Sequence, residues 1–92
     1  MPQPKEDYVN IIKNGNILDI CWAICESVVR NEVTDDIRAA IETQVENEDC
    51  FWNEYTVSDF AIAALYIIDK LTYTGERYQI KQLVDNQFAF AM

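Results

Sequence analysis

The chain has 92 residues, half of them hydrophobic, and carries 16 Asp and Glu against seven Lys and Arg, which gives a formal net charge of −9. This length suits one small domain, and the apolar content is too high for a disordered chain. The acidic balance excludes proteins that hold nucleic acid or an anionic membrane surface through surplus positive charge. We therefore expect a single acidic domain, residues 1–92, that binds neither of these directly and has a basic partner.

Three sequence features bear on the compartment. The longest uncharged apolar stretch, residues 60–68, has about half the length of a membrane span. Glu6 and Asp7 stand where a secretory signal has its apolar segment. Three cysteines are an odd number, which does not fit a disulfide framework. We expect a cytoplasmic protein.

The first half of the chain reads as three helices. Pro4 suits the first turn of one helix, which Gly15 ends. Asn16 caps a second helix over residues 17–30, and apolar residues surround most of its circumference, so we expect it to be the central and most buried helix. Thr34 caps a third helix, whose narrow apolar seam consists of Ile37, Ala40, Ile41 and Val45.

The second half is less regular. Helical periodicity is lost over residues 48–55, which we interpret as a connector, and a capping pattern at Thr56 opens a fourth helix that runs to about Thr72. Apolar spacing favours a last helix near the C-terminus, with a β-hairpin over residues 77–91 that turns at Asp85 and Asn86 as the alternative. The expected fold is therefore mainly α, a small compact bundle of four to five helices.

Catalytic signatures are missing from the sequence. Without His there is no imidazole base, and no phosphate-binding loop or EF-hand occurs. Cys21 and Cys25 lie four residues apart on the most apolar helix and lack the spacing of a zinc or redox site, so we interpret them as core residues. Cys50 is expected to be exposed, with no neighbouring cation to activate it. We expect no enzyme activity, no cofactor and no metal site.

The distribution of charge is the strongest signal. Residues 31–59 contain nine carboxylates and one base, Arg38, whereas the rest of the chain holds seven carboxylates and six bases. If the third helix continues far enough, Asp35, Glu42, Glu46 and Asp49 share one of its faces. Glu42 and Glu46 are then about 6 Å apart along the helix axis. Successive phosphates of one DNA strand are about 3.4 Å apart along the duplex axis, so the two carboxylates have nearly the spacing of every second phosphate. The other interpretation is a solvated helix that serves solubility.

A short, acidic, His-free chain of this kind resembles phage-encoded DNA-mimic anti-restriction proteins, most closely the Arn family of T-even phages. The resemblance is one of size and charge pattern, and eight carboxylates carry it: Glu32, Asp35, Asp36, Glu42, Glu46, Glu48, Asp49 and Glu54. It implies an inhibitor that occupies the DNA-binding surface of a host restriction nuclease, of the McrBC type that cuts modified-cytosine DNA, in the host cytoplasm. It also implies a homodimer, which would lengthen the acidic surface.

A second hypothesis rests on aromatic residues. The sequence places four of them in the connector and the tail, where they are either ordinary core or an exposed patch for a partner or a second copy: Phe51, Trp52, Phe88 and Phe90. An exposed patch would make the protein a non-catalytic adaptor or anti-activator. The two hypotheses differ in salt dependence, because salt screens exposed charges but leaves apolar contacts intact.

Overall fold

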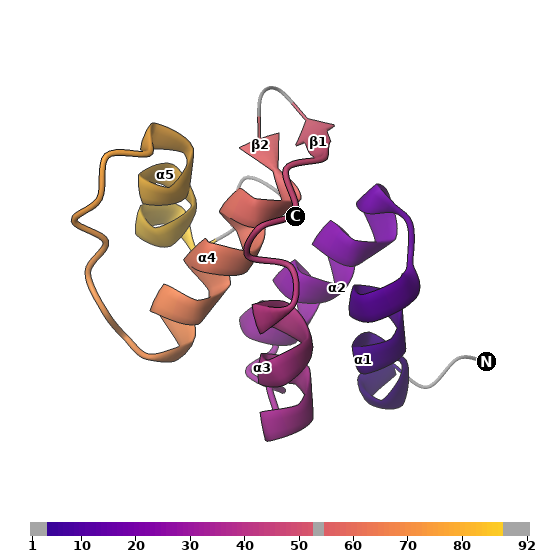
Figure 1. Cartoon of the computed structure of the whole chain (residues 1–92). Coiled ribbons are helices and arrows are strands. Elements are labelled where there is room, and N and C mark those ends of the chain that lie inside the picture. The colour runs from indigo at the N-terminus through magenta and orange to yellow at the C-terminus, as the bar shows by residue number, and fades with distance from the viewer. Residues whose placement is uncertain (1–3, 53–54, 88–92) are drawn as a thin grey trace.

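The structure, a computed structural model, describes residues 4–52 and 55–87, with the backbone alone described for residues 4–7 and 51–52. Within these ranges the chain forms five helices and one short hairpin (Figure 1). In chain order the elements are α1 (Pro4–Asn14), α2 (Ile17–Val29), α3 (Asp35–Glu42), β1 (Cys50–Trp52), β2 (Tyr55–Thr56), α4 (Val57–Ile68) and α5 (Tyr78–Asn86). The mainly helical bundle expected from the sequence is confirmed.

Three helices begin at the capping residues that the sequence indicates. Asn16 caps α2 and Thr34 caps α3, each through a side-chain oxygen that accepts a backbone amide. At α4 the capping is reciprocal: Thr56 Oγ1 accepts from the Asp59 amide at 3.2 Å, and the Asp59 carboxylate accepts from the Thr56 amide at 2.9 Å. These bonds satisfy amides that the first turn of a helix leaves without a partner.

Helix α4 is the centre of the bundle. It contacts α2, α3 and α5, and the hairpin leads directly into it (Figure 1). Residues 57–61 are all buried, as are Ala63 and Ala64, and Phe60 is completely enclosed. Alanines on several sides of α4 let three neighbouring helices approach it closely. Three residues of the apolar seam expected on the third helix, Ile37, Ala40 and Ile41, are buried on α3, whereas Val45 follows the end of the helix and is only partly buried.

The expectation that α2 is the most buried helix is wrong. Its neighbours α1 and α4, together with β1, cover only part of its circumference. Leu18, Trp22 and Val29 are therefore exposed, although Ile20 and Ile24 are buried. The sequence shows an apolar helix but does not show how many neighbours surround it, and here α4 has more neighbours than α2.

The C-terminal helix is confirmed over the hairpin alternative for residues 77–91. In α5, Ile80 and Leu83 are three residues apart and both buried, and the helix packs on α4. The hairpin of this fold lies instead in the segment expected to be a connector, where Cys50 pairs with Thr56 and Trp52 with Tyr55 in antiparallel register.

Helix α4 ends at Ile68, earlier than the expected end near Thr72. Lys70 adopts a left-handed conformation with φ 57°, and two bonds close the helix end: the Lys70 amide donates to the Ile67 carbonyl and the Leu71 amide to the Tyr66 carbonyl. This pair of bonds is the Schellman arrangement, which normally uses glycine at the left-handed position. Because lysine stands at this position in place of glycine, the end of the helix carries no recognisable signal in the sequence.

Candidate functional site

The acidic segment begins on α3. Asp35 and Asp36 lie in its first turn and Glu42 is its last residue, and all three are exposed. Asp35 and Glu42 are seven residues apart and so share a face, whereas Asp36 lies about 100° away around the helix. The negative side chains at the N-terminus of α3 also suit its dipole.

The expected row of four carboxylates on one continuous helix is wrong beyond Glu42. Glu46 and Asp49 follow the end of α3, in a segment of turns and irregular backbone. At the end of the helix the Thr43 amide donates to the Ala40 carbonyl at 3.1 Å and the Gln44 amide to the Ile41 carbonyl at 2.9 Å. The Gln44 side chain is buried, and its Nε2 donates to the Ile12 carbonyl at 2.9 Å. This link to α1 is a long-range contact that carries no local sequence signal.

Residues 43–49 are nevertheless held firmly in place, and we call them the acidic loop. Asn47 Nδ2 donates to Gln44 Oε1 at 2.8 Å. At the start of α4, Ser58 Oγ donates to the Val45 carbonyl at 2.5 Å and the Ser58 amide to the Asn47 carbonyl at 2.6 Å, while the Val57 amide bonds to the carbonyl of Asp49 at 3.0 Å. The exposed carboxylates of this loop, Glu46, Glu48 and Asp49, therefore stand on an ordered backbone.

Arg38, the one base of the acidic segment, is used internally. Its guanidinium donates two hydrogen bonds to Asp69 at 2.7 and 2.8 Å, which joins α3 to the end of α4, and its Nε lies 3.4 Å from Glu42. The hydrogen bonds with Arg38 lower the pKa of Asp69, and the same bonds raise the pKa of Arg38. Glu42 is thus partly neutralised by its own chain.

The other predicted carboxylates differ in their surroundings. Glu32 is half-buried, and its Oε1 has no hydrogen-bond partner within residues 4–52 and 55–87. Glu54 lies outside the described residues. Asp59 belongs to the acidic segment by sequence but is buried and paired with Arg77, so it adds nothing to the surface. Of the eight predicted carboxylates, five are exposed and make no ion pair with any residue that the structure describes: Asp35, Asp36, Glu46, Glu48 and Asp49.

The three cysteines differ in their exposure. Cys21 and Cys25 are buried, as expected, and burial raises the pKa of Cys21 to about 12 and also raises that of Cys25. Cys50 is exposed. Among the residues that the structure describes, no group of three or more Cys, Asp or Glu side chains is placed to hold a metal ion. Within the same residues, no helix is both long and apolar enough to cross a bilayer.

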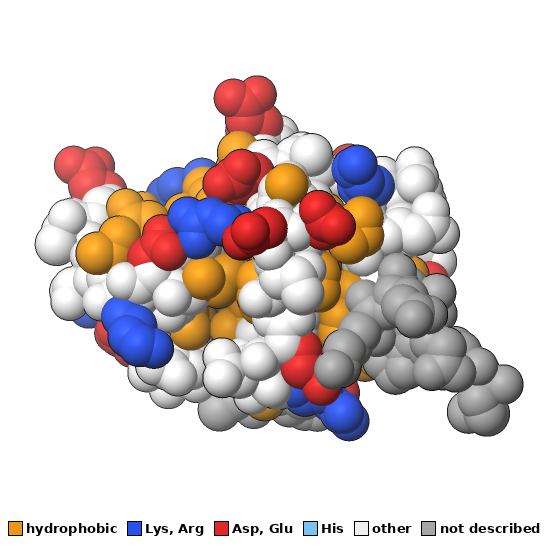
Figure 2. All heavy atoms as spheres, turned by 90° about the horizontal axis from the view of Figure 1, so that it is seen from below, with side chains coloured by type: hydrophobic (Ala, Val, Ile, Leu, Met, Phe, Trp, Pro, Cys, Tyr) orange, Lys and Arg blue, Asp and Glu red, His pale blue; other side chains and the backbone are white. Residues whose placement is uncertain are grey.

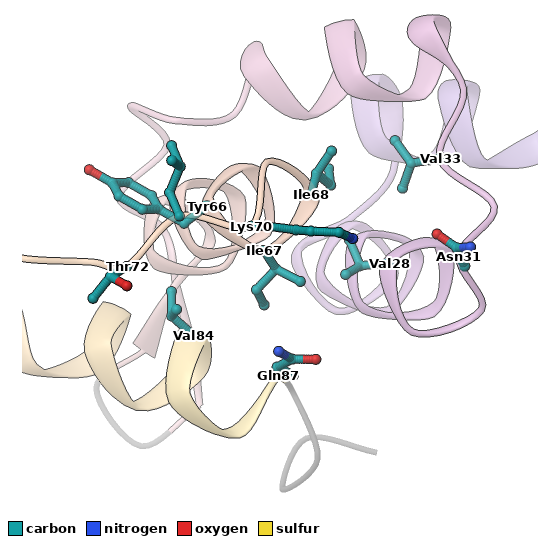
Figure 3. A pocket seen from close by; sticks show the side chains of 11 residues that line it. Val28, Asn31, Val33, Tyr66, Ile67, Ile68, Lys70, Thr72, Val84 and Gln87 are labelled. Atoms are coloured by element: carbon teal, nitrogen blue, oxygen red, sulfur yellow. The ribbon is translucent and has the colours of Figure 1, made fainter.

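A hollow of about 540 Å³, which the sequence did not indicate, lies where α2, α4 and α5 end (Figure 3). Three of its lining residues, Asn31, Lys70 and Gln87, have positive φ, and each follows the end of one of these helices. Only Asn31 is of a type that readily adopts this conformation. The other lining residues are Val28, Val33, Tyr66, Ile67, Ile68, Leu71, Thr72 and Val84. Among the residues that the structure describes, no carboxylate or thiol lines the hollow.

The view from below the bundle shows hydrophobic side chains in the middle of that face, with acidic and basic side chains around them (Figure 2). The negative charge therefore does not cover this face uniformly. The aromatic patch of the second hypothesis falls outside what the structure describes, since the side chains of Phe51 and Trp52 and the whole of Phe88 and Phe90 are not included.

Comparison of the chain with protein-family models, with curated proteins and with solved structures finds no match.

Proposed function

We propose that the protein is a non-catalytic inhibitor that imitates the charge of DNA and occupies the DNA-binding surface of a host restriction nuclease. The observation that supports this proposal is the ordered acidic loop beside α3. Together they display five exposed, unpaired carboxylates, while the only base in the segment is turned toward Asp69. Surfaces that bind DNA are rich in Lys and Arg, and an ordered negative surface is complementary to them.

The spacing of charge on α3 is compatible with this function. Asp35 and Glu42 are separated by about 10 Å along the helix axis, which equals about three phosphate steps on one DNA strand. The acidic loop extends the charge beyond the helix. Hydrogen bonds to Ile12 and Ser58 already order the loop. The loop therefore loses little conformational entropy when it binds a partner.

The test compares two double variants of equal charge. Glu46→Gln with Glu48→Gln removes two carboxylates from the acidic loop without touching a helix cap or the Arg38 contacts. The control, Glu76→Gln with Asp85→Asn, removes two exposed carboxylates on and before α5. We expect the first variant to inhibit an McrBC-type nuclease about tenfold less well, and the control to change inhibition by less than about twofold. Equal inhibition by both variants would contradict the proposal.

A further inference from the structure

The hollow at the ends of α2, α4 and α5 is a feature that the proposed function does not use (Figure 3). Its volume of about 540 Å³ lies within the roughly 300–1,000 Å³ that is typical of small-molecule sites. Each of the three helices contributes an aliphatic side chain to its lining, Val28, Ile67 and Val84, and all three are partly buried and pack against the core. The apolar part of the lining is therefore a continuation of the core that stays partly open to solvent.

Polar side chains that have no partner within the described residues also line the hollow. The side-chain amides of Asn31 and Gln87 and the hydroxyl of Thr72 are exposed, and none of them makes a hydrogen bond to a residue that the structure describes. Each of these groups can both donate and accept. A few polar groups beside an apolar surface are what orients a small ligand in its site.

Lys70 is the one charged side chain among the described residues that line the hollow. It is exposed, it forms no ion pair within the described part of the chain, and Figure 3 shows it extended toward the end of α2. Asp69, its neighbour in the chain, is already neutralised, because its two carboxylate oxygens accept from Arg38 at 2.7 and 2.8 Å. In a chain with 16 acidic residues, this hollow presents a positive charge and so favours an anionic ligand.

Two further acids adjoin lining residues in the sequence, but neither lines the hollow. Asp85 pairs with Lys81 at 3.1 Å. Glu32 lies near Tyr8 of α1, because burial, Glu26 and Glu32 together raise the pKa of the Tyr8 phenol, and none of the described lining residues belongs to α1. The charge in direct contact with a ligand in the hollow is therefore that of Lys70.

Helix ends oppose an anion, because the last carbonyls of a helix carry partial negative charge. At each of these three ends, however, a carbonyl of the last turn accepts a hydrogen bond from the amide of the residue with positive φ that follows the helix: Asn31 donates to Val28, Lys70 to Ile67 and Gln87 to Val84. These bonds satisfy the carbonyls and reduce their repulsion of an anion. The Lys70 ammonium offsets what remains.

We propose that the hollow binds a small organic carboxylate with an apolar body. The carboxylate lies against the Lys70 ammonium, and the body contacts Val28, Ile67 and Val84. A charge-assisted hydrogen bond is stronger than a neutral one, and burial of the apolar body removes it from water. The net charge of −9 acts against an approaching anion, but about 0.15 M salt limits this repulsion to roughly 8 Å.

The probe that tests the proposal is 4-phenylbutyrate, in which a phenyl ring and an alkyl chain end in one carboxylate. Its neutral counterpart is 4-phenylbutanamide. Each is titrated into the nitrogen-15-labelled full chain, and the shifts of backbone amide signals in NMR spectra give both the site and the dissociation constant. We expect 4-phenylbutyrate to shift the amides of Asn31, Lys70 and Gln87 with a dissociation constant on the order of 1 mM. The amide probe should bind about fivefold more weakly, because it lacks the charge.

Lys70→Met removes the ammonium and keeps an unbranched side chain at this position. We expect it to weaken binding of 4-phenylbutyrate about fivefold and to change binding of 4-phenylbutanamide by less than about twofold. The control is Lys81→Met, which removes an equal charge from α5 outside the described lining and should change binding of either probe by less than about twofold. Val84→Phe places a larger side chain in the hollow and should abolish the shifts caused by both probes, while the dispersion of the spectrum shows that the fold is kept.

Four results would each overturn the proposal. They are the absence of shifts at the lining amides at about ten times the expected constant, equal binding of the two probes, equal effects of Lys70→Met and Lys81→Met, and unchanged binding in a folded Val84→Phe variant. These measurements involve no nuclease and no residue of the acidic loop, so their outcome is independent of the proposed function.

Discussion

At the scale of single residues, Asp59 shows that a carboxylate of the acidic segment can be structural. It is buried, accepts a hydrogen bond from the Thr56 amide and pairs with Arg77. We expect Asp59→Ala to lower the free energy of unfolding by about 2–3 kcal/mol, because it removes half of the cap of α4 and the partner of Arg77. Urea unfolding measures this loss. The exposed Asp85 is the control, and Asp85→Ala should cost less than about 0.5 kcal/mol; a similar loss in both variants would rule out the structural role of Asp59.

The contact between Asp69 and Arg38 makes stability depend on pH. Arg38 lowers the pKa of Asp69 below its ordinary value of 3.8, so the folded state binds this proton less readily than the unfolded state. The contact therefore stabilises the fold above about pH 4, and this stabilisation is lost as the pH falls through the lower, folded pKa.

We accordingly expect Asp69→Asn to lower the Tm modestly at pH 7, where the carboxylate of the original chain is ionised and bonded to Arg38. The difference in Tm between the two proteins should shrink below about pH 4, because Asp69 then becomes protonated in the original chain as well. Thermal unfolding followed by circular dichroism across this range checks the expectation. A constant difference down to pH 2, roughly two units below the unfolded pKa, would mean that ionisation of Asp69 plays no part.

At the scale of elements, the acidic loop depends on two side chains that carry no charge. Gln44→Ala together with Ser58→Ala removes the bonds to Ile12 and Val45 and leaves the net charge unchanged. We expect faster hydrogen exchange at the Val57 amide, whose acceptor is a loop carbonyl, and a loss of stability of about 2–3 kcal/mol. Exchange measured by NMR reports both quantities.

The same variant tests whether order in the acidic loop matters for inhibition. If fixed carboxylates imitate DNA, loosening residues 43–49 should weaken inhibition of the nuclease several-fold even though no charge is lost. The control is Gln79→Ala, which replaces a partly buried glutamine of α5 far along the chain from the loop. Unchanged inhibition by a loosened loop would show that charge alone, without order, is sufficient.

How much of the fold the sequence predicts depends on whether the signal is local. The starts of α2, α3 and α4 were predictable because Asn16, Thr34 and Thr56 cap their own helices. The arrangement of the residues that follow α3 was not, since Gln44 there donates to a carbonyl 32 residues earlier in the chain. The end of α4 was missed because Lys70 takes a conformation that glycine usually adopts.

In the candidate site, too, the features with a local signal were predictable and those that depend on distant residues were not. Composition alone located the carboxylates of residues 31–59, and α3 carries three of them as expected. Their pairing required the tertiary structure, because the partner of Arg38 is Asp69, 31 residues away. The exposed face of α2 could not be predicted for a related reason. Apolar residues surround most of this helix, and their pattern does not show which side lacks a neighbouring element.

At the scale of the whole molecule, a net charge of −9 with no His makes the protein strongly acidic throughout the physiological pH range. A complex held mainly by such charge should form quickly at low salt and weaken steeply as salt rises. A complex held by an aromatic patch should be nearly insensitive to the same change. The salt dependence of binding therefore separates the DNA mimic from the adaptor.

We expect the chain, immobilised and exposed to host lysate, to retain a DNA-handling enzyme that moderate salt releases and that duplex DNA displaces. Displacement by DNA is the observation that distinguishes a DNA mimic, because any basic protein would bind an acidic surface and be released from it by salt. The loop variant Glu46→Gln with Glu48→Gln provides the internal comparison: it should release the same enzyme at a lower salt concentration, since fewer contacts with Lys and Arg remain. An enzyme that stays bound when DNA is added in excess would be held at a surface other than its DNA-binding site, and the carboxylates of the acidic loop would then need a different explanation.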